Sequence, residues 1–397
     1  MLIELLLAIL LGILFGSLTA ITPGLHINTI SILLITYSAI ALNYFHPIIL
    51  VAFIISMSIM HTTGDPIPSI FLGAPDADQA LSVQPGHRLL FQGKGFEAVY
   101  LTVIGSLLAV LSIILITPIF FLIISKTYSS IVNFIPFILI LAALFLIIKE
   151  PKSKFYAIFI FFLSGILGLI TTSSNTAQPL LPLLSGLFGI SALIYGLFNK
   201  IKIPKQIITF PKLKKSEILS PLILGATSSI FMGFLPALGA SQAATISASI
   251  KELKTKSFLI MMGSINTFVM IISFIALYLI DKTRSGSVVA ISELLETITF
   301  NHLILFIAIT LIAAGVAAII TIKIAKIFTK IINKINYRIL SIIIIFIIIA
   351  LTIVINGFSS LLILFTATSI GLIPHIKGIR KIYLMGSLML PTILFLI

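Results

Sequence analysis

The sequence predicts an all-α polytopic membrane protein built from two repeats, which we expect to be inverted relative to each other. The first observation is the composition: of 397 residues, 59% are hydrophobic and only 9% are charged, and the mean hydropathy is +1.26. A soluble domain of this length does not have such a composition. The second observation is that two long apolar runs are each interrupted by a proline.

The first interruption lies in Gly12–Ser31, where Pro23 and the glycine after it separate two apolar runs. An unpaired backbone N–H or C=O group in hydrocarbon costs several kcal/mol. Membrane proteins therefore keep such breaks where the freed backbone is buried in protein or lines a watery cavity, often at a substrate or ion site. A comparable stretch, Gly225–Ala244, follows 213 positions later and has Pro236 in the corresponding place.

In chain order, the first predicted repeat covers residues 1–198 and begins with a broken hairpin at 2–42. The polar segment 64–96 is expected to be a re-entrant or interfacial loop, because its apolar middle is too short to span a bilayer. The second repeat covers 218–397. Full crossings are expected at about 47–63, 97–125, 131–148, 155–170, 179–198, 257–280, 302–322, 339–356, 357–374 and 382–397. The second broken hairpin is expected at 218–250, and a short amphipathic or re-entrant helix at 288–299.

Five full crossings in each repeat, an odd number, place the repeats in opposite orientations, as in many secondary transporters. On this count the lysine-rich loops share one face, and the basic linker 199–217 lies in the cytoplasm. These loops are 149–154, 199–217, 251–256, 323–338 and 377–381. The excess of 25 Lys+Arg over 11 Asp+Glu fits the positive-inside bias rather than nucleic-acid binding, since no basic stripe lies on a soluble domain.

Two further features limit the class of protein. The chain has no cysteine, which excludes disulfides, thiolate metal sites and cysteine nucleophiles. The start of the chain lacks the positive region of a cleavable signal peptide, so we expect it to remain as a membrane segment. We therefore expect a multi-pass protein of the cell (plasma) membrane.

A helix that restarts after a proline presents free N–H donors and the positive end of its dipole, a suitable site for a carboxylate. Two such ends meeting near the middle of the membrane would hold a small dicarboxylate with few charged residues. The candidate substrate-binding residues are Pro23, Gly24, Leu25, His26, Asn28 and Thr29 in the first repeat and Pro236, Gly239, Ala240, Ser241 and Gln242 in the second. Arg284 can pair with a substrate carboxylate or serve as a topology anchor.

Four residues are candidates for ion coupling: Asp65, His61, Asp76 and Asn266. Asp65 follows a crossing directly, and His61 lies one helical turn earlier on the same face. Asp65 could bind Na⁺ or carry a proton, or it could only cap the segment that starts at Pro66. Asn266 lies in the middle of a crossing, where a buried amide needs a partner, either an ion or another helix.

Three stretches resemble the large membrane subunit of tripartite tricarboxylate transporters, the TctA family. They are Pro23-Gly24-Leu25, the loop Gly73–Leu81 followed by Gln92–Ala98, and Pro236–Ala240. The resemblance implies uptake of carboxylates driven by an ion gradient, together with a small membrane subunit and an extracytoplasmic binding protein. The chain departs from the usual family pattern at His26, where bacterial members usually have glycine, and at Pro236-Ala237, where they usually have Pro-Gly.

These observations favour a secondary-transporter permease for small organic anions resembling di- and tricarboxylates, which works by alternating access. A first alternative is a translocase for a lipid-linked phosphate, because helix N-termini also bind phosphate. A second alternative is an intramembrane hydrolase that uses His61 and Asp65. The metalloprotease, nucleophile-elbow and P-loop motifs are missing from the sequence. We expect no enzyme activity, no cofactor and no resident metal, with Na⁺ or H⁺ as the coupling ion.

Overall fold

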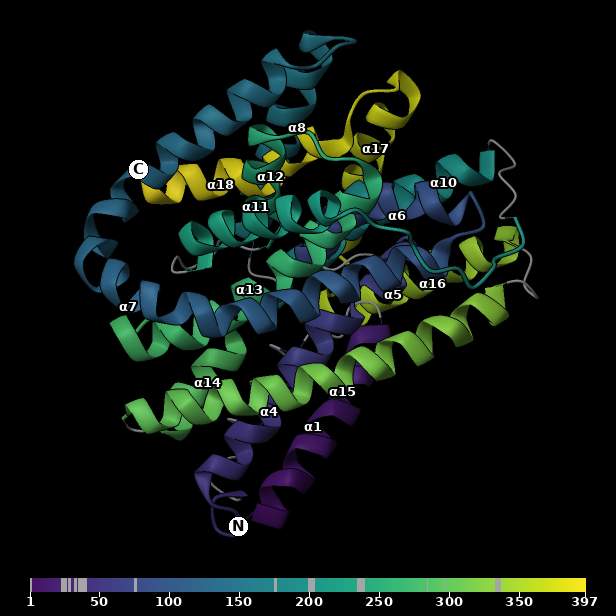
Figure 1. Ribbon diagram of the computed structural model, residues 1–397. Helices are drawn as coiled ribbons and strands as arrows, with labels where there is room; N and C mark the ends of the chain where they lie inside the picture. Colours follow the sequence, from purple (N-terminus) through teal and green to yellow (C-terminus); the bar gives the residue numbers. More distant parts are fainter. Residues whose placement is uncertain are drawn as a thin grey trace.

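The computed structural model describes residues 2–22, 27, 30–31, 34, 41–74, 77–174, 177–198, 204–233, 240–283, 285–295, 297–332 and 337–397. This part of the chain is all-helical (Figure 1). The helices are α1 (Leu2–Ile21), α4 (Pro47–Gly64), α5 (Pro66–Phe71), η1 (Ala77–Ser82), α6 (Val83–Leu90), α7 (Gly95–Ile148), α8 (Lys154–Thr172), α9 (Leu180–Leu184), η2 (Ser185–Ile190), α10 (Ser191–Phe198), α11 (Lys215–Gly233), α12 (Ala240–Ile250), α13 (Thr255–Ile280), α14 (Gly286–Leu294), α15 (Phe300–Ile332), α16 (Tyr337–Asn356), α17 (Ser360–Lys377), η3 (Lys381–Met385) and α18 (Gly386–Leu396).

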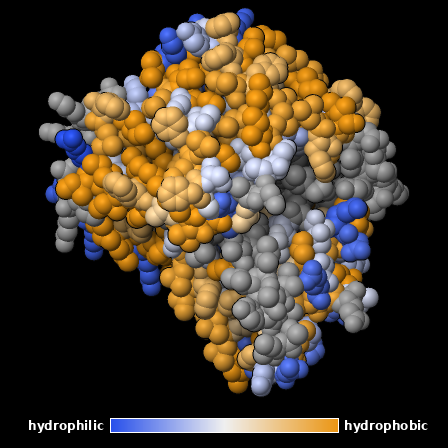
Figure 2. All heavy atoms as spheres, turned by 180° about the vertical axis from the view of Figure 1, so that it is seen from behind, coloured by the Kyte–Doolittle hydropathy of each residue, from blue (hydrophilic) through white to orange (hydrophobic). Residues whose placement is uncertain are grey.

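Eight segments in the described part of the chain are long and apolar enough to cross a membrane. Many large hydrophobic side chains on these helices are exposed, as expected for surfaces that face lipid. Figure 2 shows one face of the molecule covered mostly by hydrophobic side chains. The predicted all-α polytopic membrane fold is confirmed, and the chain is a multi-pass membrane protein.

Helix α13 is the centre of the bundle. Its residues from Leu259 to Leu277 are buried without a gap. A helix that is apolar on all sides belongs inside a bundle, and α13 packs against α4, α7, α11 and α15. Its two ends define two faces of the molecule, which the contacts below identify.

One face, called here the Lys-rich face, carries the beginnings of α7, α11 and α13. Short polar contacts join these segments to one another and to the ends of α12 and α17. They are Lys256 Nζ to Glu97 Oε1 at 2.7 Å, Thr209 Oγ1 to Glu97 Oε2 at 3.1 Å, Lys251 Nζ to Ser220 Oγ at 3.0 Å, Arg380 Nη2 to Glu252 Oε1 at 3.2 Å and the Tyr383 hydroxyl to Glu150 Oε2 at 2.9 Å. Four of the five predicted lysine-rich segments therefore lie side by side.

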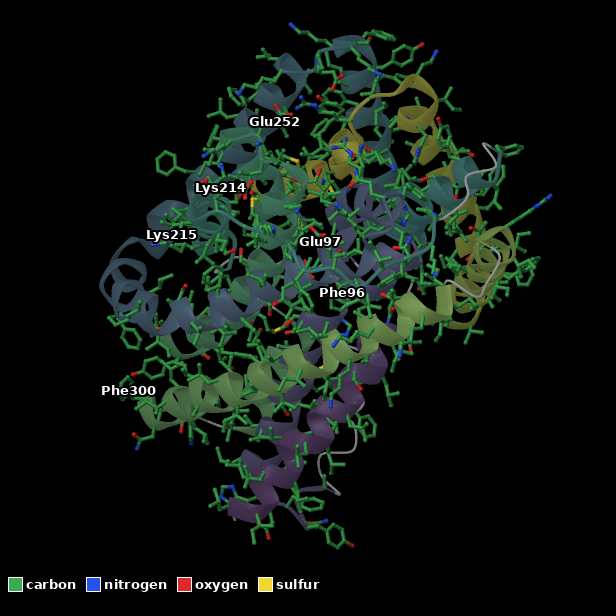
Figure 3. All side chains as sticks on the ribbon, turned by 45° about the vertical axis from the view of Figure 1, so that its right-hand side comes forward. Phe96, Glu97, Lys214, Lys215, Glu252 and Phe300 are labelled. Carbon is green, nitrogen blue, oxygen red and sulfur yellow. The ribbon has the colours of Figure 1, made fainter. Side chains whose placement is uncertain are left out.

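The opposite face is marked by rings of Phe121, Tyr278 and Phe300, whose centroids lie 5.6–6.2 Å apart. Figure 3 labels Glu97, Lys214, Lys215 and Glu252 on the Lys-rich face, and Phe300 lies apart from them at the start of α15. Helix α13 and the first part of α7, from Gly95 to Phe121, therefore run from the Lys-rich face to the opposite face, and α15 runs back. The second part of α7 also returns, because Glu150 just after its end contacts Tyr383 on the Lys-rich face.

Two parallel helix pairs have the same type of contact. In α1 and α4, a Cβ atom added to Gly12 would collide with Ser56, and one added to Gly64 would lie 2.9 Å from Ala20 Cβ. In α11 and α13, a Cβ atom added to Gly225 would lie 2.5 Å from Ser264 Oγ. The segment between α11 and α13 must therefore return towards the face from which that pair starts. Helix α12 does so, because Lys251 at its end reaches Ser220 near the start of α11.

Two sequence predictions about helix boundaries are wrong. The predicted turn between crossings 97–125 and 131–148 is absent, because α7 is one helix of 54 residues that contains Pro118 and Pro136. A straight helix of this length would measure about 80 Å against a hydrocarbon core of about 30 Å. The ribbon of α7 instead changes direction at the left of Figure 1, as expected for a helix with internal prolines.

The second correction concerns the predicted loop 323–338, since α15 continues to Ile332. Its lysines Lys323, Lys326 and Lys330 are all exposed, so the helix keeps them on a solvated side. The segment 64–96, which we expect to be re-entrant or interfacial, contains α5, η1 and α6. After a turn at Asp65, α5 extends the span that α4 begins, and all six of its residues are buried.

Close packing between α7 and α13 predicts a clear stability effect. A Cβ atom added to Gly263 would collide with the carbonyl oxygen of Thr102, and one added to Gly105 with that of Ile260. We expect Gly263→Ala to destabilise the protein by about 1–3 kcal/mol, because backbone has to move apart. The measurement is thermal unfolding of the purified protein in detergent. Gly315→Ala is the matched control, since nothing lies within 4 Å of its added Cβ, and a control variant as unstable as Gly263→Ala would contradict the prediction.

Candidate functional site

A group of polar side chains lies buried in the middle of the bundle, around Asn266 of α13. Asn266 follows Lys256 on the Lys-rich face by ten residues and precedes Tyr278 on the opposite face by twelve. At 1.5 Å per residue it lies about 15–18 Å from each face, near the middle of a hydrocarbon core of about 30 Å. An ionisable or amide group at that depth is expensive and usually functional.

The centre of this group is the pair Asp65 and Asn266, which are 3% and 2% exposed. Asn266 Nδ2 donates to Asp65 Oδ2 at 3.0 Å and to Oδ1 at 3.2 Å. It also donates to the carbonyl oxygen of Thr62 at 3.0 Å. The pair thereby joins the end of α4 in the first half of the chain to the middle of α13 in the second.

The local sequence explains why the Thr62 carbonyl accepts a side-chain donor. In a continuous helix this oxygen would accept from the residue four positions later, which is Pro66 and has no N–H group. Pro68 removes the helical donor of the Gly64 carbonyl in the same way. Two carbonyl groups and the Asp65 carboxylate thus lie together at a break between α4 and α5. Carbonyl and carboxylate oxygens at an interrupted helix are typical ligands of Na⁺ in transporters, and a carboxylate there can also carry H⁺.

His61 belongs to the same buried region but to a different hydrogen bond. Its Nδ1 atom lies 2.9 Å from Thr19 Oγ1 of α1, and Thr19 Oγ1 also lies 3.0 Å from the Gly16 carbonyl oxygen. In this contact Nδ1 donates to Thr19 in one imidazole tautomer and accepts from the Thr19 hydroxyl in the other. This contact fixes the end of α1, where the first predicted break begins, against α4.

A chain of hydroxyl groups extends the polar region to α7. Thr63 donates to the Ile59 carbonyl at 2.8 Å and lies 3.2 Å from Ser106 Oγ, which lies 2.7 Å from Thr267 Oγ1. Each hydroxyl has one proton and can both donate and accept, so the three groups form a continuous hydrogen-bonded chain. These bonds hold α4, α7 and α13 together beside the Asp65–Asn266 pair.

A second carboxylate marks the start of α12. Asp78 Oδ1 of η1 accepts a hydrogen bond of 2.7 Å from the backbone N–H of Ala240, the first residue of α12. Since α12 has 11 residues and ends at the Lys-rich face, this amide lies about 15 Å below that face. A carboxylate from the first half of the chain thus occupies a helix N-terminus of the second half.

The predicted site residues are distributed as follows. Asp65 and Asn266 are in contact. His61 lies on α4, four residues before Asp65, and forms a hydrogen bond with Thr19. Ala240, Ser241 and Gln242 are buried in the first turn of α12. The capping role considered for Asp65 is not seen, because its side chain makes no cap hydrogen bond to α5. Pro23, Gly24, Leu25, His26, Asn28, Thr29, Asp76, Pro236, Gly239 and Arg284 lie outside the described residues.

Sequence reasoning missed Thr19, Thr62, Ser106 and Thr267 as members of the polar group. Thr62 could have been found, because Pro66 four residues later removes the donor of its carbonyl. The other three have no local signal, since single Ser and Thr residues in spans usually bond their own helix. Only the packing of α1, α7 and α13 around α4 brings them together.

Comparisons with known proteins agree with this membrane fold. The family model described as Tripartite tricarboxylate transporter TctA family matches residues 6–386. The chain is also 33% identical over 402 residues to Uncharacterized protein MJ1079 of Methanocaldococcus jannaschii, with 98% of each chain covered. No solved structure matches the chain.

The family match spans nearly the whole chain and includes both interrupted stretches, the Asp65 region and α13. The family is one of transporters and not of enzymes, and its members are components of tripartite systems. The chain therefore belongs to the tripartite tricarboxylate transporter TctA family.

Proposed function

We propose that the chain is the permease subunit that moves small di- and tricarboxylates across the plasma membrane, driven by a gradient of Na⁺ or H⁺. The observation that carries this proposal is the buried Asp65–Asn266 pair, which lies at mid-membrane depth between the two halves of the chain. A carboxylate at that depth costs free energy unless it has a function such as ion coupling.

Alternating access requires two halves that can move around a central site, and we propose that these halves are inverted repeats. The parallel pairs α1/α4 and α11/α13 support this arrangement. The first pair runs towards the Lys-rich face and the second runs away from it, and each places a glycine against a serine, Gly12 on Ser56 and Gly225 on Ser264. The break after α1 and the break before α12 are then equivalent features.

The coupling ion would bind at Asp65. The carboxylate and the carbonyl oxygen of Thr62 are now joined through the side-chain amide of Asn266. A Na⁺ ion would take the oxygens of these groups as ligands, or a proton would neutralise the carboxylate. In either case the charge of Asp65 is balanced, which lowers the cost of moving this region relative to the rest of the bundle.

The substrate would bind at the start of α12, with one carboxylate on the Ala240 amide. The bond from Ala240 to Asp78 supports this assignment, because in it the amide donates to a carboxylate. Asp78 would be displaced by the substrate and would return when the substrate leaves. The second carboxylate would reach the corresponding break at Pro23 and Gly24, including His26, Asn28 and Thr29.

By analogy with the family's tripartite systems, a small membrane subunit and an extracytoplasmic binding protein would deliver the substrate. The positive-inside rule would then place the Lys-rich face in the cytoplasm. Delivery would take place at the opposite face, and release at the Lys-rich face.

The test is uptake by the purified chain in proteoliposomes, with radiolabelled succinate and citrate and an imposed gradient of either Na⁺ or H⁺. We expect saturable uptake that needs one of the two gradients. The assay is run with and without a small membrane subunit and an extracytoplasmic binding protein of a tripartite system. Phosphate and a lipid-linked phosphate serve as competitors. Failure of every di- and tricarboxylate to enter, under all of these conditions, would rule out the proposed function.

A further inference from the structure

A cavity of about 180 Å³ opens near the Lys-rich face between α6, the connection of α12 to α13, and η3. Its floor includes the apolar side chains Leu146 and Phe188, both buried. Its charged lining is mainly basic. Four cationic side chains, Arg88, Lys251, Arg380 and Lys381, line it together with one carboxylate, Glu252.

The positive charges in this cavity are not balanced within the described part of the chain. Arg380 pairs with Glu252 at 3.2 Å, and Glu252 is 82% exposed. Arg88, Lys251 and Lys381 have no carboxylate within ion-pair distance among the described residues. Burial and the charge of Arg88 lower the pKa of Lys381 from 10.5 to about 7. A cluster of cations with too few carboxylates to balance it favours a bound anion.

The position of the cavity connects it to the substrate site proposed above. Ala80 and Leu81 of η1 form part of its wall, and Asp78 of the same short helix contacts the Ala240 amide. Helix α12 runs from that amide to Lys251 at the cavity rim, a distance of about 15 Å. The cavity therefore lies alongside α12 between mid-membrane depth and the Lys-rich surface.

We propose that this cavity is a second binding site for the transported di- or tricarboxylate, where the anion is held by Arg88, Lys381 and Lys251 between the mid-membrane site and the Lys-rich face. The inference rests on the proposed function. Guanidinium groups bind carboxylates through paired hydrogen bonds, and the apolar floor accommodates a short carbon chain. The cavity has room for a small anion.

The Arg380–Glu252 ion pair lies at the cavity rim, where Glu252 competes with an entering anion for Arg380. Glu252 belongs to the connection between α12 and α13, and Arg380 lies just before η3. While they are paired, one of the four cations is occupied. An entering anion would take over Arg380 and free Glu252 to the solvent.

The experiment is equilibrium binding of radiolabelled citrate to the purified full-length chain in detergent. We expect Arg88→Gln to weaken binding about tenfold, because one charge-assisted contact is lost. We expect Glu252→Gln to strengthen it about threefold, because Arg380 becomes available. Poor folding can weaken binding but cannot strengthen it, so the expected gain in affinity of Glu252→Gln does not depend on how well a variant folds. Lys326→Gln on α15 is the matched control, since Lys326 is exposed and outside the cavity.

A pH profile provides a readout that a structural role would not change. Lys381 is protonated below its pKa of about 7, so citrate binding should weaken as the pH rises from about 6 to about 8. Lys381→Arg keeps the charge and should flatten the profile. Citrate ionises in the same way in both experiments, so the difference between the two profiles reports Lys381 alone. The charged and titratable groups around Lys381 are Arg88 and His87 of α6, His375 of α17, Lys251, Glu252 and Arg380. The pKa of His87 is lowered to about 3 by burial and by Lys381, so it does not titrate in this range.

The possible failures are distinct. If the wild-type chain transports citrate but Arg88→Gln and Glu252→Gln bind it as Lys326→Gln does, the cavity inference alone is overturned. If phosphatidylglycerol or inorganic phosphate binds in the cavity and citrate does not, the site belongs to another anion and the inference is also overturned. If the wild-type chain neither binds nor transports any di- or tricarboxylate, the proposed function fails first.

Discussion

Asp65→Asn is expected to remove the ion dependence of carboxylate uptake while leaving the protein folded. Asparagine has nearly the same shape and still offers one oxygen to Asn266, so the 3.0 Å contact between α4 and α13 can be kept. The change removes the only charge of the pair. A hydrogen bond or contact to a charged group contributes about 1.5–3 kcal/mol, which corresponds to a loss of about tenfold to a hundredfold in ion affinity.

The measurement compares two modes of transport in the same proteoliposomes. Gradient-driven uptake should fall at least tenfold, whereas exchange of internal for external carboxylate, which needs no net ion movement, should remain. Asp281→Asn is the matched control. Asp281 is exposed at the end of α13 with a φ angle of 49°, a conformation that asparagine also adopts readily. Uptake by Asp65→Asn that responds to the gradient as strongly as uptake by Asp281→Asn would contradict the assignment.

The sequence predicted most of the spans because their signal is strong and local. A run of about 20 apolar residues is sufficient to predict a crossing, and α8, α13 and α17 lie within a few residues of their predicted positions. The pairing of Asp65 with Asn266 was not predictable in the same way. Each residue was a candidate on its own, but they are 201 positions apart, and only the packing of α4 on α13 brings them together.

The errors have physical causes that local patterns do not contain. The polar residues 126–130 resemble a turn, yet α7 remains helical through them, because a polar segment at a membrane surface does not have to interrupt a helix. The lysines of α15 also resemble a loop, but three exposed lysines on an otherwise apolar helix are compatible with a helix that leaves the membrane. Prolines bend α7 without ending it, since neighbouring helices support the bend.

The contact between Asp78 and Ala240 leads to the second prediction. If the Ala240 amide is the place where a substrate carboxylate binds, then Asp78 competes with the substrate for it. We expect Asp78→Asn to increase substrate affinity about tenfold, because the substrate no longer displaces a charged group from a helix N-terminus. Asparagine stabilises helix N-termini about as well as aspartate does, so the start of α12 should remain ordered.

Turnover should change in the opposite direction. A substrate that binds more tightly to a site without its internal competitor leaves more slowly, so the maximal rate should fall while the half-saturating concentration falls with it. The measurement is the concentration dependence of uptake, with Ser153→Ala as the control. Ser153 accepts a hydrogen bond from the N–H of Tyr156 at the start of α8, so its loss disturbs a helix start without touching the site. Unchanged or weaker substrate binding by Asp78→Asn would mean that Asp78 only caps α12, and the substrate would then have to be sought elsewhere along the interface of the two halves.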